Sequence, residues 1–282
     1  MPTKESEQVI YLQHPSGSTA EVSLFGATVT SWVVENVERI FVSKKAKRDG
    51  TKAIRGGIPI CFPIFGTKEK IDLPQHGFAR NHYWEYTGIM KDDDDEVSVR
   101  FGLKDTQLPH ETRKRWSHSF RLHYTVTLGE KTLKTFFSLK NEDEDTFEFN
   151  MLLHTYFLVP DITKVAVQGL TSCEYIDKVQ NGINVTEENE KVTINGEVDR
   201  VYKKVQDKVL LEVNNDSTIQ IEKFNLKDTV VWNPWIEKAK SMADFDDEEY
   251  KNMICVEVGS VAEWVVLAGG STWTAGQTLT IV

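Results

Sequence analysis

The chain has 282 residues, of which 40% are hydrophobic and 10% aromatic, enough to form a sizeable buried core and to exclude an intrinsically disordered chain. Its 33 basic and 43 acidic residues give a net charge of −10, which argues against nucleic acid or an anionic membrane as a partner. No apolar run approaches the roughly 20 residues that span a bilayer, so a transmembrane helix is not expected.

Alternating apolar and polar residues, typical of half-buried strands, dominate the chain. In chain order, strands are expected at Val97–Leu103, Phe120–Leu128, Phe147–Leu153, Val165–Val167, Ile219–Ile221, Ile254–Val258 and Leu279–Ile281. Helical patterns are weak and limited to Asp105–Arg115 and Asp246–Asn252. The acidic runs Asp92–Glu96 and Asn141–Asp145 are interpreted as solvated hairpin tips, because like charges are costly to bury.

The sequence therefore predicts an all-β fold, a large antiparallel β-sandwich with few short helices. No Pro/Gly/Ser linker or shift in composition divides residues 1–282, so a single domain is expected. The three cysteines are an odd number and each lies beside apolar residues, which is typical of buried free thiols in a reducing compartment. Because the first residues contain no apolar segment of signal-peptide length, a cytoplasmic location is expected.

Several common catalytic motifs are absent from the sequence. It contains no GxxxxGK[S/T], GxGxxG, HExxH or GxSxG string, so nucleotide-dependent chemistry and serine-hydrolase chemistry lose their usual support. The seven histidines are scattered and no Cys-x-x-Cys pair occurs, so the expectation is that the protein has no metal site.

Two segments rich in glycine and proline, Arg55–Gly66 and Leu73–Asn81, carry polar side chains among apolar and aromatic neighbours. Their prominent polar residues are Arg55, Gln75, His76 and Arg80. Rigid loops that hold such groups over an apolar base are typical of a pocket wall. The alternative is that the arginines pair with surface acids and the aromatic residues only fill the core.

Two apolar strands each place one titratable side chain away from their most apolar face. Alternation over Phe147–Val159 puts His154 opposite the phenylalanines, and alternation over Met253–Gly259 puts Glu257 opposite three aliphatic residues. A strand histidine is commonly a hydrogen-bonded structural group. A carboxylate in such a strand either meets a cation or faces a polar cavity, where it is a candidate general base.

Five strings occur in the order RGGIP from Arg55, PQHGFARN from Pro74, HTYF from His154, VVWNPWIEK from Val230 and CVEVG from Cys255. Together they resemble the hexose-6-phosphate mutarotases, also called glucose-6-phosphate 1-epimerases, of the aldose 1-epimerase superfamily. The resemblance implies a large galactose mutarotase-like β-sandwich that interconverts the α and β anomers of a hexose 6-phosphate and requires no cofactor.

The resemblance also implies roles for residues at matching positions. His154 matches the family's general acid and Glu257 its general base. Arg55 and Arg80 match the residues that receive the phosphate, and Gln75 lies beside them in the sequence.

Two further positions also match residues of the family. His76 matches a histidine that lines the sugar site, and Asp199 resembles an aspartate that binds sugar hydroxyls. The sequence departs from the family's pattern at Val258, where proline is common, and at Gly269-Gly270, where an Ala-Pro-Gly turn is typical.

These residue types suit the opening of a sugar ring. A base must remove the proton of the anomeric hydroxyl while an acid protonates the ring oxygen, and each such group contributes roughly 10²–10⁴ in rate. We expect Glu257 to rest ionised and His154 protonated, on opposite sides of the sugar. The expected partner is a small sugar phosphate, and the sequence leaves the oligomeric state open, with a monomer as the simplest case.

Two alternative functions remain at this point. A non-catalytic carbohydrate-binding β-sandwich could stack a sugar on Trp232, Trp235 or Phe65, although such a module has no need of a Glu–His pair. A glycoside hydrolase needs two carboxylates that flank one bond, and the sequence offers one well-placed candidate.

Overall fold

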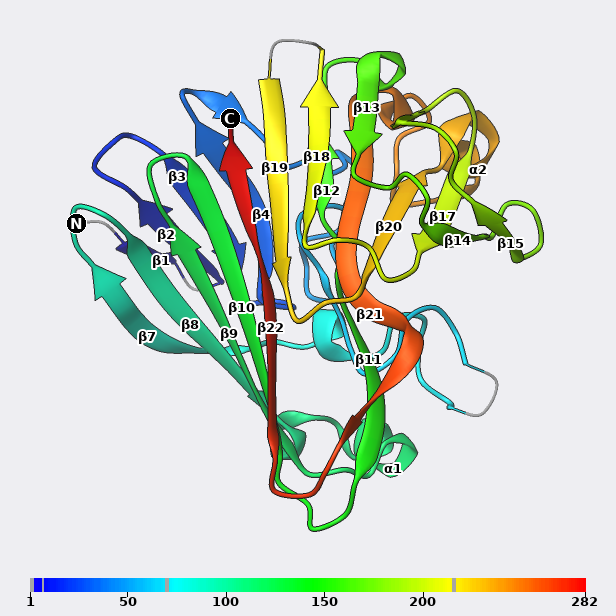
Figure 1. The fold of residues 1–282 in the computed structure, drawn as a ribbon. Coiled ribbons are helices and arrows are strands. Elements are labelled where there is room, and N and C mark those ends of the chain that lie inside the picture. The colour runs from blue at the N-terminus through cyan, green and yellow to red at the C-terminus, as the bar shows by residue number, and fades with distance from the viewer. Residues whose placement is uncertain (1–2, 7, 69–70, 215–216) are drawn as a thin grey trace.

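The computed structural model describes residues 3–6, 8–68, 71–214 and 217–282. Within these residues the strands form three sheets whose neighbouring strands are antiparallel, and the two larger sheets face each other (Figure 1). The expected antiparallel β-sandwich is therefore confirmed. No helix in this part of the chain combines the length and the apolar character needed to cross a bilayer.

The strands are assigned to the sheets as follows. The five-stranded sheet contains β1 (Thr3–Ser6), β2 (Val9–Gln13), β3 (Thr19–Ser23), β4 (Thr28–Val34) and β5 (Val37–Glu38). The nine-stranded sheet has the order β16 (Lys191–Thr193), β13 (Val165–Gln168), β18 (Lys208–Val213), β19 (Ser217–Phe224), β22 (Thr272–Ile281), β10 (Thr132–Asn141), β9 (Phe120–Leu128), β8 (Val97–Lys104) and β7 (Glu85–Asp92). The eight-stranded sheet has the order β15 (Ile183–Thr186), β14 (Glu174–Asp177), β17 (Val198–Tyr202), β20 (Asp228–Asn233), β21 (Met253–Leu267), β11 (Phe147–Leu153) and β6 (Ile60–Cys61), with β12 (Tyr156–Leu158) paired to β21.

Short helices connect these strands. They are α1 (His110–Arg115), α2 (Trp235–Ser241) and the 3₁₀ turns η1 (Ala79–Asn81), η2 (Asp105–Gln107), η3 (Ile162–Lys164) and η4 (Glu249–Asn252). Each of the seven expected strands lies within an observed strand, namely β8, β9, β11, β13, β19, β21 or β22.

The core between the two large sheets is built from the alternating faces of their strands. In β9 every second residue from Phe120 to Leu128 is buried, as its alternation predicts. Phe62, from the segment Arg55–Gly66, packs against three other phenylalanines of the core. Its ring centroid lies 5.7–5.9 Å from those of Phe78, Phe120 and Phe149. Phe62 belongs to the first and Phe78 to the second of the two glycine- and proline-rich segments, so the core anchors both segments that were expected to form a pocket wall.

Three expectations about local structure differ from the observed fold. The helix expected at Asp105–Arg115 is divided into η2 and α1, with Pro109 immediately before α1. The helix expected at Asp246–Asn252 is only the 3₁₀ turn η4. The acidic run Asn141–Asp145 joins β10 to β11, which lie in different sheets, so it is a connection between sheets and not a hairpin tip.

Candidate active site

His154 and Glu257 meet on the face of the eight-stranded sheet that points away from the main core. In β21 the aliphatic residues Ile254, Val256 and Val258 enter the core between the sheets, and alternation places Glu257 on the opposite face. His154 directly follows β11, whose last residue pairs with Val258. This register brings the imidazole Nδ1 to 3.3 Å from the carboxylate Oε1 of Glu257.

Burial controls the protonation of this pair. Burial raises the pKa of Glu257 well above its ordinary value, with Lys178 and Arg80 acting in the opposite direction. Burial also lowers the pKa of His154 well below its ordinary value, and the neighbouring His76, Arg80, Arg55 and Lys178 lower it further. Both shifts favour the neutral forms.

The expectation of a resting ion pair on opposite sides of a sugar is therefore corrected in two respects. His154 and Glu257 are in direct contact, and the low-dielectric surroundings favour a neutral imidazole beside a protonated carboxyl. The pair nevertheless has free hydrogen-bonding capacity, because His154 Nδ1 and Glu257 Oε2 are buried without a hydrogen-bond partner in the described structure.

Aromatic rings surround the imidazole of His154. Tyr156 stacks on it with a centroid distance of 4.6 Å and an interplanar angle of 9°. Trp232 and His76 meet it edge-on, at 6.1 Å and 5.7 Å. Tyr156 was not predicted as a site residue, although it lies two residues after His154 and so on the same side of the chain.

His76 occupies a constrained position in the second loop segment. Its backbone φ is +66°, and its ring Nδ1 accepts a hydrogen bond of 3.1 Å from the backbone N–H of Gly66. Burial lowers the pKa of His76 well below the usual histidine value, with smaller contributions from Arg80, Lys178 and Arg55. The imidazole is therefore neutral and held by the backbone on one edge.

A cavity of about 450 Å³ is lined by two of the expected substrate-binding residues, whereas His154 and Glu257 are not among its lining residues. Gln75 and Asp199 line it together with Phe65 and Lys178. Lys178 and Asp199 are close enough to Glu257 to shift its pKa, which connects the cavity electrostatically to the carboxylate. A larger hollow of about 700 Å³, lined by Lys203, Trp264 and others, contains none of the predicted site residues.

The two expected phosphate-binding arginines have different surroundings. Arg55 donates from Nε and Nη2 to the carboxylate of Asp244 at 3.2 Å and 3.4 Å, and from Nη1 to the hydroxyl of Tyr156 at 3.3 Å. Arg80 donates from Nη2 to the backbone carbonyl of Gln75 at 3.1 Å, and its buried Nε has no hydrogen-bond partner among the described residues. Arg55 is thus already neutralised by a carboxylate, whereas Arg80 retains donor capacity.

Lys178 is a cation that the sequence did not identify. Its ammonium lies 3.3 Å from a carboxylate oxygen of Asp199 and 4.3 Å above the ring of Phe65. It follows the last residue of β14 and reaches the site only because β14 and β17 are neighbours, so no local motif marks it.

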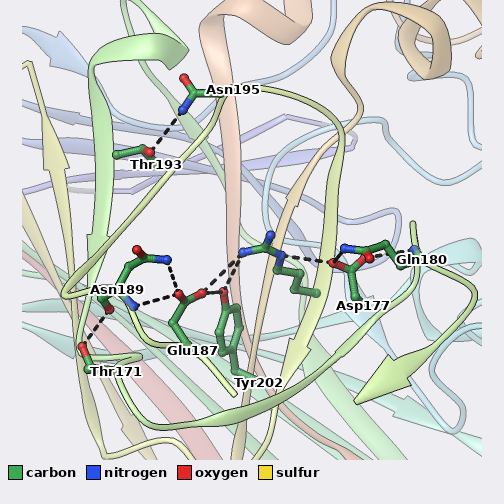
Figure 2. A network of polar contacts seen from close by, with 9 residues as sticks. Thr171, Asp177, Gln180, Glu187, Asn189, Thr193, Asn195 and Tyr202 are labelled. Carbon is green, nitrogen blue, oxygen red and sulfur yellow. Dashed lines mark hydrogen bonds and ion pairs between the residues drawn. The ribbon is translucent and has the colours of Figure 1, made fainter. Parts of the chain in front are cut away.

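A network of polar contacts involves Asp177 and Arg200, the chain neighbours of Lys178 and Asp199, and its members Asp177, Glu187 and Tyr202 are labelled in Figure 2. Arg200 bridges Asp177, at 3.5 Å, and Glu187, at 3.4 Å, and Tyr202 donates a hydrogen bond of 2.9 Å to Glu187. Asp177 also accepts from the backbone N–H groups of Val179 and Gln180 at 3.0 Å and 3.1 Å. These contacts fix the turn that carries Lys178 and the strand that carries Asp199.

Comparison with known proteins assigns the family. The profile of the aldose 1-epimerase family matches residues 8–280 of this chain. The chain belongs to the aldose 1-epimerase family. Membership indicates an isomerase of the epimerase type and argues against the alternative of a non-catalytic carbohydrate-binding module.

Relatives support the same conclusion. A protein of Cenchrus ciliaris, provisionally named glucose-6-phosphate 1-epimerase, is 38% identical over 290 residues, covering 99% of this chain and 86% of the relative. An Escherichia coli K12 protein with the same provisional name is 34% identical, covering 90% and 84% of the two chains. A Salmonella typhimurium crystal structure, provisionally described as a mutarotase, superposes with a TM-score of 0.89 at 30% identity, covering 99% and 92%.

Proposed function

We propose that this member of the aldose 1-epimerase family interconverts the α and β anomers of a hexose 6-phosphate. The observation that carries the proposal is the contact of a buried imidazole with a buried carboxyl group, each with an unpartnered polar atom. Lys178 and Asp199, which line the 450 Å³ cavity, act electrostatically on that carboxyl group. The names of the relatives, which refer to glucose 6-phosphate, support this substrate class.

In the proposed mechanism, Glu257 accepts the proton of the anomeric hydroxyl and His154 donates a proton to the ring oxygen. The bond from the anomeric carbon to the ring oxygen then breaks, which leaves an open-chain aldehyde. Rotation about the next carbon–carbon bond and the reverse proton transfers close the ring as the other anomer. Both reacting oxygens are bonded to one carbon, so side chains in contact, such as this pair, can serve both.

The pair needs one shared proton for this cycle. Burial raises the pKa of Glu257 and lowers that of His154, which favours the shared proton on Glu257 when no sugar is bound. The mechanism requires the same proton on His154, because His154 is the proposed acid and Glu257 the proposed base. Nδ1 and Oε1 lie 3.3 Å apart without a hydrogen bond between them, so a small reorientation that brings them into hydrogen-bond geometry would allow the transfer. Lys178 and Arg80 lower the pKa of Glu257 and so favour the carboxylate that the mechanism requires.

Substrate binding is assigned to the residues around the cavity. We propose that Arg80, aided by Lys178, binds the phosphate, and that Gln75, His76 and Asp199 bind sugar hydroxyls. Arg55 is the weaker phosphate ligand, because its three donor nitrogens already contact Asp244 and Tyr156. Its proposed task is to position Tyr156, and through it the imidazole.

The phosphate assignment is tested with Arg80→Ala. Loss of a charge-assisted hydrogen bond costs about 1.5–3 kcal/mol, so we expect KM for glucose 6-phosphate to rise about 10- to 100-fold. KM for free glucose should change little. Arg113→Ala, on the exposed surface of α1, is the matched control and should alter neither value. An equal change in KM for both sugars would rule out phosphate binding by Arg80.

We also propose a reducing compartment, the cytoplasm, as the location of the protein. All three cysteines are free, which suits a compartment that keeps thiols reduced. Fractionation of cells that produce the protein, with the three thiols titrated in each fraction, tests this proposal.

A further inference from the structure

A third potential ligand lies next to the proposed acid and base. The Sγ atom of Cys255, one nitrogen of His154 and one carboxylate oxygen of Glu257 all lie within 4.8 Å of one another, and all three residues are buried. The arrangement follows from the strands: Cys255 and Glu257 are two residues apart on one face of β21, and the neighbouring strand β12 pairs Tyr156 with Cys255.

The donor set of this cluster suits a particular type of cation. Imidazole, thiolate and carboxylate are the groups that bind Zn²⁺, whereas Mg²⁺ and Ca²⁺ prefer oxygen ligands alone. Three protein ligands with one open position are also the usual number in an accessible zinc site. The 3.3 Å separation of Nδ1 and Oε1 is compatible with two ligands on one tetrahedral ion.

Two buried atoms in the cluster lack a partner. Nδ1 of His154 and Oε2 of Glu257 have no hydrogen bond in the described structure, although both side chains are more than nine-tenths buried. An unpartnered buried polar atom is unfavourable unless a ligand satisfies it. The proposed ring-opening reaction explains why His154 and Glu257 keep unpartnered atoms that can bond to a sugar. The same reaction gives no role to the thiol of Cys255.

We propose that His154, Cys255 and Glu257 form an inhibitory binding site for Zn²⁺ or a similar thiophilic divalent cation. On binding, the thiol and the carboxyl group each release a proton to solvent, the ion forms bonds to sulfur, nitrogen and oxygen, and no electron is transferred. Two of the three ligands are the proposed acid and base, so an occupied site cannot open a sugar ring. Zinc binding itself does not depend on the proposed function; only the inhibition does.

The chain offers a matched control for the thiol. Cys61 in β6 is, like Cys255, fully buried near Glu257, which contributes to raising the pKa of both thiols. Among the described residues, however, Cys61 is not part of the cluster of potential ligands. Cys61→Ala and Cys255→Ala therefore remove the same atoms from two buried positions, only one of which has a proposed ligand.

The first experiment measures metal binding in the absence of sugar. Co²⁺ is titrated into the metal-free wild-type protein, and the sulfur-to-cobalt charge-transfer band in the near ultraviolet is recorded, followed by displacement with Zn²⁺. We expect the band in the wild type and in Cys61→Ala, and its loss in Cys255→Ala, with Zn²⁺ affinity reduced more than about 10-fold. No band in the wild type, or an unchanged band in Cys255→Ala, overturns the site.

The second experiment measures the consequence for turnover. Mutarotation of free glucose, which carries no phosphate to chelate the metal, is followed with and without Zn²⁺. We expect inhibition of the wild type and of Cys61→Ala but not of Cys255→Ala; equal inhibition of all three overturns the proposal. Cys255→Ser provides a second variant if the alanine variant does not fold, as judged by circular dichroism. A protein that shows the band but accelerates the mutarotation of neither glucose 6-phosphate nor free glucose, both measured without Zn²⁺, refutes the proposed function and leaves the metal site standing.

Discussion

The contact between His154 and Glu257 is the residue-scale feature on which the proposed chemistry depends. Strand alternation in the sequence predicted that both side chains leave the core face, and the structure agrees. Their protonation could not be predicted from the sequence, because it depends on burial and on cations from other strands. Lys178 escaped prediction for the same reason, since only the pairing of β14 with β17 brings it to Asp199.

Removing either member of the pair should stop catalysis without preventing binding. We expect Glu257→Gln and His154→Asn each to lower kcat by roughly 10²–10⁴, the usual contribution of a proton-transfer group. Rates of anomer exchange are measured by NMR on glucose 6-phosphate, and binding by calorimetry. Near-normal turnover in either variant would exclude that residue from the mechanism.

The pH dependence of turnover provides a test of the lowered pKa of His154. The active pair carries one shared proton, so activity is lost on the acid side when the pair takes up a second proton and Glu257 can no longer act as the base. Because the pKa of His154 lies well below its ordinary value, that second proton is taken up only under conditions more acidic than an ordinary histidine requires. We therefore expect kcat/KM for free glucose to stay level as pH falls through 6.5 and to decline only below it. Free glucose is used because a phosphate group itself titrates near pH ~6. An acid limb centred on the ordinary histidine pKa contradicts the assignment.

The pairing of β11 with β21 is the element-scale feature that aligns the acid and the base. The alternating patterns predicted both strands, but they could not predict the register, which includes a shift between Phe149 and Met151. The sequence also gave no signal for α2, because seven residues are too few to establish a helical period. The acidic run Asn141–Asp145 was misassigned because charge predicts solvent exposure and not which sheets a segment joins.

Gly259→Ala tests the importance of this strand pairing. A Cβ at Gly259 would lie 2.7 Å from the carbonyl oxygen of Met151 and 2.7 Å from the Cβ of Leu152, both in β11. Overpacking of this kind costs about 1–3 kcal/mol, so we expect a lower free energy of unfolding together with a lower kcat as β11 moves away from β21. Gly196→Ala is the control, because its Cβ would meet no atom within 4 Å. Equal stability of the two variants would contradict the proposed close packing.

On the scale of the whole molecule, the net charge of −10 contrasts with the local cations Lys68 and Lys178, which line the cavity, and Arg80, which together with Lys178 lowers the pKa of Glu257. The five ordered strings indicated the family that the comparisons show. The arrangement of cations could not be inferred from net charge, because it depends on which strands are neighbours in the eight-stranded sheet. The prediction of a single domain over residues 1–282 stays a prediction.

The salt dependence of KM distinguishes the local cations from the overall charge. The screening length is about 30 Å at 0.01 M salt and about 8 Å at 0.15 M. If Arg80 and Lys178 dominate at the cavity, KM for glucose 6-phosphate should rise with salt while KM for free glucose stays constant. A fall in KM for the phosphorylated sugar would show that repulsion by the whole protein dominates instead.

The hydrogen bond from the Gly66 N–H to Nδ1 of His76 has one more consequence. An acceptor nitrogen carries no hydrogen, so the neutral ring must bear its single N–H at Nε2. His76 is consequently a permanent hydrogen-bond donor whose tautomer is set by the main chain. The ring of His76 lies only 5.7 Å from that of His154. Because its Nδ1 is occupied by the backbone N–H of Gly66, we expect that His76 does not replace His154 as the general acid in the His154→Asn variant.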